Sequence, residues 1–419
     1  MSAKALPYGQ HLIEADDLAA VGEALHADLV GPGHLSGEDA RSLLADMAAL
    51  PLTGGPRVSQ FEAALAEAVD APFAVACASG TSALHLILSA LDVDGDSACV
   101  VPAITFLSTA TAARLCGAEV VFADVDPETG LMRPQDLAEA LGRAARPVKA
   151  ALPVHLGGRA CDMAGMAEVA AAHGVALVED GCHALGTRAA GGRVGDGRFS
   201  AATAFSFHPV KTIACGEAGG VTTRDPALAA RIQRLRNHGV TREAALLTDP
   251  ELSIGADGAP NPWSYEQLEL GFNYRMSELE AALGLSQIGK LARFVERRRV
   301  LSDLYDRLLA PLAPNVRPVA RGGGESLHLY GVLIDFAALG LDRGALMRGL
   351  AARGIGTQVH YIPVYRQPYF TALYGRQRLA GAEAYYARAL SLPLFPAMTD
   401  DDVRRVCAAL AAELLKSER

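Results

Sequence analysis

Hydrophobic residues in the middle of the chain gather in short runs, which are separated by longer amphipathic stretches. Each run is short and rich in Val and Ala, a pattern typical of a strand that is buried on both faces of a sheet. The runs predict these strands: Ala74–Ser79, Ala98–Ala103, Glu119–Val125, Ala150–His155, Ala176–Gly181, Thr203–Phe207 and Gly219–Thr223.

Helix-length segments lie between most of these strands. Strands that alternate with helices pair in parallel, so the pattern predicts an open α/β sheet. The last two runs follow each other without a helix, which predicts that the sheet is mixed. The intervening helices are expected at Thr81–Leu91, Phe106–Leu115, Pro134–Arg143 and Met163–His173.

The pattern changes after about residue 245. We expect a large domain over residues 1–244 and a smaller C-terminal α/β domain over residues 245–419, which includes a long linking helix. The elements predicted in the second part are a helix from about Ser277 to Leu312, strands His328–Ile334 and Gly356–Tyr361, and helices near 342–353, 381–390 and 399–416.

Composition and charge argue against several classes of protein. The chain has 419 residues, 50% of them hydrophobic, and a formal net charge of -9 without a basic stripe, which argues against a nucleic-acid partner. Its seven cysteines are scattered and form no C-x-x-C pair, so we expect neither a disulfide framework nor a metal site. There is no signal-peptide pattern and no apolar run long enough to span a bilayer. We therefore expect a cytoplasmic protein without a membrane segment.

Ligands of open α/β sheets bind at the carboxyl ends of the strands, so the residues there are the candidates for chemistry. Lys211 lies in a loop just past a predicted strand and is followed by a Gly-rich return. Desolvation at such a place lowers the pKa of a lysine and frees its amine for a Schiff base. A purely structural lysine is the alternative.

Asp180 ends another predicted strand. A buried carboxylate requires a cationic partner, and a protonated pyridine nitrogen is one such partner. The alternative is that Asp180 caps a following helix.

Two further strand ends suit an aromatic phosphate ester. Ser79, Gly80 and Thr81 form a small-residue turn that opens a helix, where free N–H groups bind phosphate. Phe106 follows the next strand and could stack on an aromatic cofactor, although core packing is the alternative for this residue. Phosphate turn, aromatic residue, carboxylate and lysine thus fall at strand ends of one sheet, and this combination carries more weight than any one motif.

At this point the chain resembles the DegT/DnrJ/EryC1/StrS family of sugar aminotransferases. The resemblance implies the type I fold of pyridoxal 5'-phosphate (PLP) enzymes, which is that of aspartate aminotransferase, with a large mixed seven-stranded sheet. The segments that carry the resemblance are Ser79–His85, Glu179–Gly186, Ser206–Lys211, Gly271–Met276 and Leu392–Phe395.

Within the family, the chain is most similar to the C4 aminotransferases of the pseudaminic acid pathway. These enzymes act on a UDP-4-keto-6-deoxy-N-acetylhexosamine, and L-glutamate is the expected amino donor. Many relatives carry Gln where this chain has His183, and the pseudaminic branch carries His. The other segments that favour this branch are Pro7–Gly9, Pro209–Lys211, Pro262–Trp263 and Val359–Tyr365.

The resemblance also implies a role for each matching residue. Lys211 would bind PLP covalently and move the proton, Asp180 would pair with the pyridine nitrogen, and His183 would lie near the ring hydroxyl. Since each active site would contain residues of two subunits, the protein would be a homodimer. The remaining implied contacts are to the phosphate from Gly80, Thr81, Ser206 and the partner subunit's Asn273, to the ring from Phe106, and to the substrate from Tyr8, His360 and Tyr361.

One departure from the family concerns residues 31–51, which look inserted just before Leu52–Pro56, a stretch that lies near the sugar in relatives. A helical pattern over Ser36–Leu50 lies between Gly- and Pro-rich ends. We interpret this element as a surface insertion, with a lid or partner contact as the alternative, and expect that nucleotide or sugar preference could differ here.

Three other functions remain to be weighed. PLP-dependent sugar dehydratases of this family replace the lysine by histidine, so Lys211 counts against them. Another nucleotide keto-sugar, such as GDP-4-keto-6-deoxymannose or a 3-keto-sugar, stays open. A non-catalytic regulatory homologue would not require the complete set of Lys211, Asp180 and Ser206.

Overall fold

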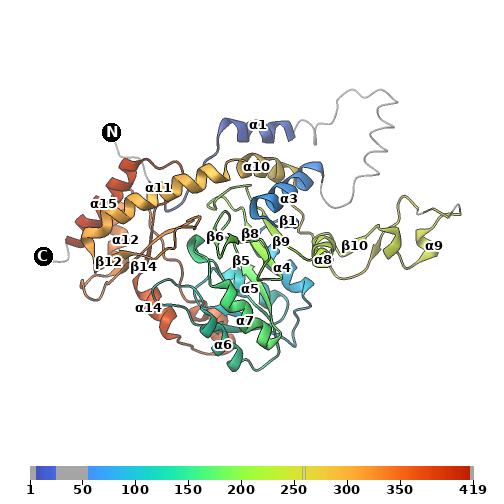
Figure 1. Cartoon of the computed structure of the whole chain (residues 1–419), viewed down its shortest axis with the longest axis horizontal. Helices are drawn as coiled ribbons and strands as arrows, with labels where there is room; N and C mark the ends of the chain where they lie inside the picture. The colour runs from blue at the N-terminus through green and yellow to red at the C-terminus, as the bar shows by residue number, and fades with distance from the viewer. Residues whose placement is uncertain (1–5, 25–54, 257, 260, 416–419) are drawn as a thin grey trace.

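The computed structural model describes residues 6–24, 55–256, 258–259 and 261–415. The predicted insertion 31–51, with its helix Ser36–Leu50, lies outside these residues. Figure 1 shows a large sheet with its helices at the centre, a smaller group of elements around β12 and β14 on the left, and a projecting segment with α9 on the right. No helix in the described ranges combines the length and apolar character that a membrane crossing requires.

The central sheet has seven strands in the order β1-β9-β8-β5-β4-β2-β3. Strand β9 is antiparallel to both of its neighbours, and the other pairs are parallel, which confirms the mixed sheet. The strands are β1 Phe73–Cys77, β2 Ala98–Pro102, β3 Glu119–Ala123, β4 Val148–Ala151, β5 Ala176–Asp180, β8 Ala202–Ser206 and β9 Gly219–Thr223.

Helices cover both faces of this sheet, which explains the unbroken apolar runs. Alternate residues of β2 enter different cores: Cys99 and Val101 join the core that includes α4, α5 and α8, whereas Ala98 and Val100 join the one with α6 and α7. A strand buried on both faces loses the polar alternation of a half-exposed one. The helices are α3 Pro56–Val69, α4 Gly80–Ala90, α5 Leu107–Leu115, α6 Pro134–Arg143, α7 Met163–His173 and α8 Pro226–Arg236.

The predicted continuous helix from Ser277 to Leu312 is wrong. Helix α10 (Glu278–Ile288) ends before α11 (Leu291–Leu309) begins, and Gly289, a poor helix former, lies between them. The two helices have different main packing partners: α10 packs on α1 (Ala15–Ala24) and α3, whereas α11 packs on α15 (Asp400–Leu414).

The smaller sheet is three-stranded and antiparallel, in the order β12-β13-β14. The predicted strand Gly356–Tyr361 is wrong: this stretch is a loop with a single bridge from Gln358 to Ser391. The third strand instead comes directly after α14, and its first two residues overlap the helix predicted near 381–390. The elements of this part are β12 Val316–Pro318, β13 Tyr330–Ile334, α12 Arg343–Ala352, α13 Pro368–Tyr374, α14 Ala380–Arg388 and β14 Ala389–Leu392.

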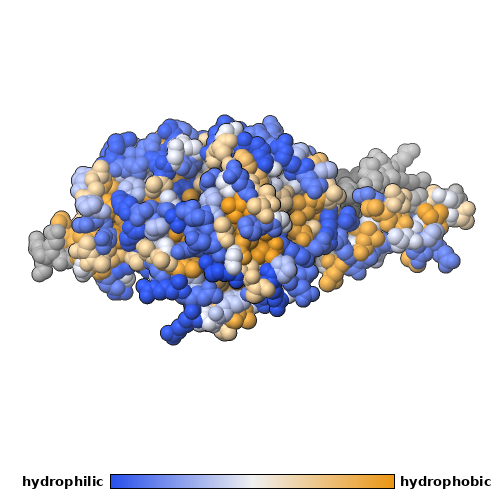
Figure 2. All heavy atoms as spheres, turned by 60° about the horizontal axis from the view of Figure 1, so that its bottom comes forward, coloured by the Kyte–Doolittle hydropathy of each residue, from blue (hydrophilic) through white to orange (hydrophobic). Residues whose placement is uncertain are grey.

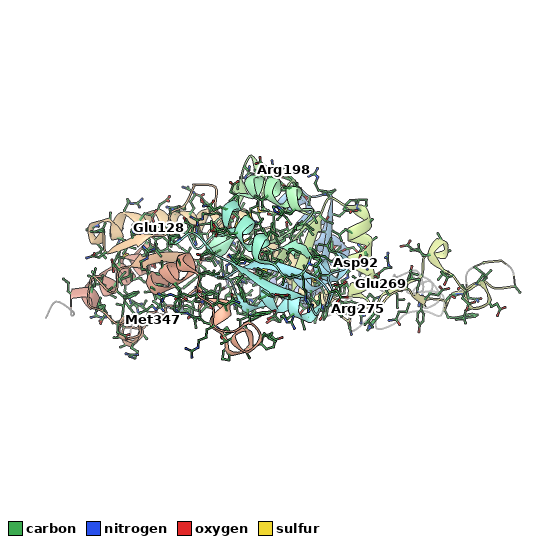
Figure 3. All side chains as sticks on the ribbon, turned by 90° about the horizontal axis from the view of Figure 1, so that it is seen from below. Asp92, Glu128, Arg198, Glu269, Arg275 and Met347 are labelled. Atoms are coloured by element: carbon green, nitrogen blue, oxygen red, sulfur yellow. The ribbon has the colours of Figure 1, made fainter. Side chains whose placement is uncertain are left out.

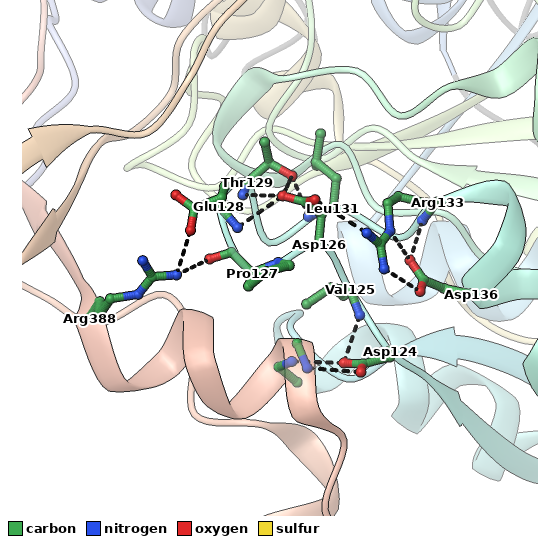
Figure 4. A network of polar contacts seen from close by, with 12 residues as sticks. Asp124, Val125, Asp126, Pro127, Glu128, Thr129, Leu131, Arg133, Asp136 and Arg388 are labelled. Atoms are coloured by element: carbon green, nitrogen blue, oxygen red, sulfur yellow. Dashed lines mark hydrogen bonds and ion pairs between the residues drawn. The ribbon is translucent and has the colours of Figure 1, made fainter.

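A polar clamp joins the loop after β3 to α14 (Figure 4). The carboxylate of Asp124 accepts hydrogen bonds from the backbone N–H groups of Gly381 at 2.9 Å and Ala382 at 2.7 Å, in the first turn of the helix. At the last turn, Arg388 donates to the carbonyl oxygen of Pro127 at 2.7 Å and to Glu128 at 2.9 Å. Both ends of α14 are thus fixed to the large sheet.

We predict that Asp124→Ala destabilises the fold by about 1–2 kcal/mol, since it leaves two N–H groups at the start of α14 without their acceptor. Chemical unfolding followed by circular dichroism measures this change. Asp96→Ala, on an exposed turn of the same sheet, is the control and should change the free energy of unfolding by less than about 0.5 kcal/mol. Equal stability of the two variants would contradict the clamp.

Candidate active site

A cavity of about 570 Å³ opens at the carboxyl ends of β5 and β8. Residues far apart in the sequence line it, from the N-terminal segment, the large sheet and the loop that follows Gly356. Of the predicted site residues, the cavity brings together Tyr8, Gly80, Thr81, Phe106, Asp180, His183, Ser206, Lys211, His360 and Tyr361. Asn273 does not line it: this residue is exposed elsewhere and forms a bridge with Asn237.

Asp180 places a nearly buried carboxylate at the floor of the cavity, with 6% of the residue exposed. Its two oxygens accept hydrogen bonds from the Thr109 hydroxyl at 2.7 Å and from the Cys182 N–H at 3.1 Å. No cationic side chain forms an ion pair with it in the described part of the chain. The alternative role as a helix cap is wrong, because only turns follow β5 before Thr187. The site therefore holds an oriented negative charge that suits a cationic ligand.

Lys211 lies in the loop after β8, in the same cavity. Burial lowers the pKa of its amine below the ordinary value, and the neighbouring Cys182 and Asp180 oppose this shift. The structure therefore raises the fraction of neutral, nucleophilic amine at neutral pH, as a Schiff-base lysine requires.

His183 is neutral and has a defined tautomer. Burial lowers its pKa well below the ordinary value, and the neighbouring basic groups of Lys211, His360 and Arg159 lower it further. Its Nδ1 accepts a hydrogen bond from the Gly157 N–H at 3.2 Å, so the single ring hydrogen belongs on Nε2. The Tyr361 hydroxyl lies 3.3 Å from Nε2 and can accept that hydrogen.

The start of α4 offers an anion site. Ser79 and Ser82 form a capping box, which leaves the N–H groups of Gly80 and Thr81 without a protein acceptor among the described contacts. A Cβ atom at Gly80 would lie 2.8 Å from the Cβ of Ser206, so glycine lets the Ser206 side chain approach the turn. Free N–H groups at a helix N-terminus together with a hydroxyl suit a phosphate group.

Two residues of this site, Thr109 and His328, carry no signal in the sequence. Thr109, which fixes Asp180, lies inside an amphipathic helix and carries no signal of its own. His328 lies in a predicted strand, yet its ring lines the cavity and lies against that of His183. Both contacts are long-range, so local pattern could not reveal them.

These residues fit PLP: a carboxylate for the ring nitrogen, a helix N-terminus for the phosphate, and a lysine of lowered pKa for the aldehyde. Phe106, 54% exposed, lies at the wall of the same cavity. Fold and site together define a PLP-dependent transferase of the aspartate-aminotransferase type. The model of the DegT/DnrJ/EryC1/StrS aminotransferase family matches residues 37–411, so the chain belongs to this family of PLP-dependent sugar aminotransferases.

Several relatives agree with this assignment. The spore coat polysaccharide biosynthesis protein SpsC of Bacillus subtilis is 36% identical over 366 residues, which covers 86% of this chain and 90% of SpsC. The structure of Helicobacter pylori PseC, an aminotransferase involved in the biosynthesis of pseudoaminic acid, superposes with a TM-score of 0.82 at 26% identity, covering 99% of this chain and 100% of PseC. The PLP form of the putative sugar aminotransferase Spr1654 from Streptococcus pneumoniae gives 0.81 at 25% identity, with 99% of each chain covered.

We predict that Lys211→Met stabilises the cofactor-free chain by roughly 0.5–2 kcal/mol at neutral pH, because burying this ammonium group is unfavourable. The folded-state pKa of Lys211 is lowered, so the unfolded chain binds more protons between that pKa and about 10.4. The free-energy cost of burying the Lys211 ammonium group is therefore complete below the lowered pKa and disappears as the pH rises towards about 10.4.

Unfolding of both proteins over this pH range measures the difference. Lys149→Met is the matched control, since Lys149 forms an ion pair with Asp94 near the surface. This control should change stability by less than about 0.5 kcal/mol. A Lys211→Met chain no more stable than wild type at neutral pH would contradict the prediction.

Proposed function

We propose that this aminotransferase moves the amino group of L-glutamate to C4 of a UDP-4-keto-6-deoxy-N-acetylhexosamine, for the biosynthesis of pseudaminic acid or a related glycan. The observation that carries transamination is the presence of Lys211 and Asp180 in one cavity. The similarity to PseC over the whole chain and the histidine at position 183 favour this substrate. GDP-4-keto-6-deoxymannose or a 3-keto-sugar is the alternative.

Lys211 and Asp180 divide the chemistry between them. PLP, when bound, supplies an electron-withdrawing ring that stabilises negative charge at the carbon being deprotonated. Asp180 would hold its carboxylate against the ring nitrogen and keep that nitrogen protonated. Lys211 would hold the cofactor through Nζ, and its amine, when free, would take the proton from the α-carbon of the donor and return it during transfer. L-Glutamate leaves as 2-oxoglutarate, and the keto group of the sugar becomes an amine.

The remaining residues orient the reactants. Gly80, Thr81 and Ser206 would bind the phosphate, and Phe106 would cover a face of the ring. His183 presents Nε2–H towards Tyr361 and would face the ring hydroxyl. The placement of all five residues on the wall of one cavity supports these roles.

Tyr8, His360 and Ile362 form an uncharged part of the cavity wall, which Glu217 also lines. Burial and the charge of Lys211 lower the pKa of His360 to about 3, and its Nδ1 lies 2.8 Å from the Ser391 hydroxyl. The ring of Tyr8 lies 5.6 Å from that of His360, centroid to centroid. Such a lining, with Ile362 beside it, suits an uncharged hexose better than a sugar acid.

A second copy of the chain would complete the site. Asn273 is exposed outside the cavity, close to the base of the projecting segment 244–270, which carries exposed apolar side chains (Figure 2). The most exposed of them are Leu252, Trp263, Tyr265 and Leu270. Such a concentration of apolar surface marks a protein interface. We therefore propose a homodimer in which Asn273 contacts the phosphate in the site of the partner.

The base of this segment is fixed to the large domain. Arg231 forms ion pairs with Asp92 at 2.7 Å and with Glu269 at 3.0 Å, and Figure 3 labels both carboxylates there. Arg275 donates a hydrogen bond to Asn237 at 2.6 Å. A fixed base gives the segment a defined direction, as a dimer contact requires.

We place the reaction in the cytoplasm. The seven cysteines are all unpaired in the structure, which suits a reducing compartment. A net charge of -9 gives no reason to expect a nucleic-acid partner.

We predict that Lys211→Ala loses at least about 10³-fold in turnover but still binds pyridoxamine phosphate, because only the covalent link and the proton carrier are removed. Wild-type protein should be yellow and lose its visible band with L-glutamate. Turnover with a panel of UDP-, GDP- and dTDP-linked keto-sugars identifies the substrate, and NMR gives the configuration of the new amine. Substantial transamination by Lys211→Ala would refute the role of the lysine, and exclusive use of a GDP-sugar would refute the proposed substrate.

A separate prediction tests the shared site. Asn273→Asp should weaken cofactor binding by at least about tenfold, through repulsion of the phosphate in the partner subunit. Lys211→Ala and Asn273→Asp chains, each impaired alone when PLP is limiting, should regain activity when unfolded together and refolded as mixed dimers. One of the two sites in a mixed dimer then has both wild-type residues. Absence of this complementation in dimers that do form would contradict sharing of Asn273.

A further inference from the structure

Two buried imidazoles lie against each other in the wall of the cavity. The rings of His183 and His328 are 4.6 Å apart, centroid to centroid, and inclined at 41°. His328 is 4% exposed, and its Nδ1 has no hydrogen-bond partner in the described part of the chain. The proposed function leaves this residue without a role.

The main chain at Gly157 holds both histidines. Its N–H donates to Nδ1 of His183 at 3.2 Å, and its carbonyl oxygen accepts from the N–H of His328 at 3.0 Å. The next residue, Gly158, has φ of 96°, and a Cβ there would lie 2.1 Å from the carbonyl oxygen of Ser326. Glycine therefore allows the two segments to approach closely, and their backbone contact sets the distance between the rings.

Helix α11 holds His328 from the other side. The guanidinium of Arg298, 1% exposed, donates to the carbonyl oxygens of His328 at 3.2 Å and Leu394 at 2.8 Å. Burial lowers the pKa of Arg298 to about 10, so it still carries its charge at neutral pH. The backbone of His328 is thus fixed at both its N–H and its carbonyl group.

The basic groups around the two rings oppose protonation of either one. Lys211, His360 and Arg159 face His183, and its ring lies beside the Tyr361 hydroxyl. Lys211, His360 and Arg298 face His328, which also faces His183 itself. Together with burial, these groups lower the pKa of both histidines well below the ordinary value, so each ring carries one hydrogen.

We propose that His328 is a positioning residue for His183. The ring of His328 packs against the ring of His183 and holds it in one orientation. In this orientation Nδ1 accepts a hydrogen bond from the Gly157 N–H, and Nε2 carries the ring hydrogen. The inference rests on the proposed function only in that His183 faces the ring hydroxyl of the cofactor. A rotation of the His183 ring by half a turn would replace Nδ1 by a carbon atom and lose the Gly157 bond. The packed face of His328 hinders this rotation.

The test is ¹⁵N NMR of the full-length protein with labelled histidine, both PLP-loaded and cofactor-free. His183→Gln identifies the signals of His183. Wild type should show an unprotonated Nδ1 and a protonated Nε2 that do not titrate between about pH 6 and about pH 9. His328→Leu should shift both signals towards averaged values, because the ring then exchanges between states. His328→Phe, which keeps a planar ring, should retain the wild-type signals.

His85→Leu is the matched control, since His85 is buried and packs against Phe272 at 4.6 Å. It should leave the His183 signals unchanged. Thermal unfolding checks each variant, and His328→Asn replaces His328→Leu if the latter does not fold. Wild-type His183 signals in the Leu or Asn variant, or averaged signals in His328→Phe, would overturn the proposal. Failure of the proposed function would instead appear as wild-type enzyme that aminates no keto-sugar, with these signals unaffected.

Discussion

One buried carboxylate constrains the rest of the site. Asp180 ends a strand that is covered on both faces, and its two hydrogen bonds come from a hydroxyl and a backbone N–H, neither of which carries charge. An ionised carboxylate in such surroundings has no ion-pair partner among the described side chains, and its removal from water is unfavourable. In the proposed function a protonated pyridine ring would supply the missing charge, so that the unbalanced charge of Asp180 would contribute to affinity for the cofactor.

The same burial acts on the basic groups in the opposite sense. It lowers the pKa of Lys211, His183, His328 and His360, because each of them would be cationic in its protonated form. The lysine thereby becomes nucleophilic, and the histidines become neutral groups with one donor and one acceptor nitrogen. Burial thus lowers the pKa of residues that have different roles in the site.

The cavity depends on contacts between distant parts of the chain. Tyr8 reaches it from an N-terminal segment that pairs with Ile355 through Leu6. The loop with His360 and Tyr361 is held next to β14 by the bridge from Gln358 to Ser391. The clamp around α14 then fixes the smaller sheet to the large one. Substrate-side residues therefore keep their positions only while both sheets stay packed together.

The sequence by itself determined the strands of the large sheet and the placement of Lys211 and Asp180 at strand ends, because burial on both faces leaves an apolar run that ends where the chain meets the ligand. It did not reveal the break at Gly289, since the helical pattern continues while the packing partner changes from α3 to α15. Only the tertiary structure decided that Gly356–Tyr361 is a loop lining the cavity and that His328 lies against His183. These features depend on side chains separated by more than a hundred residues, and local periodicity carries no information about such contacts.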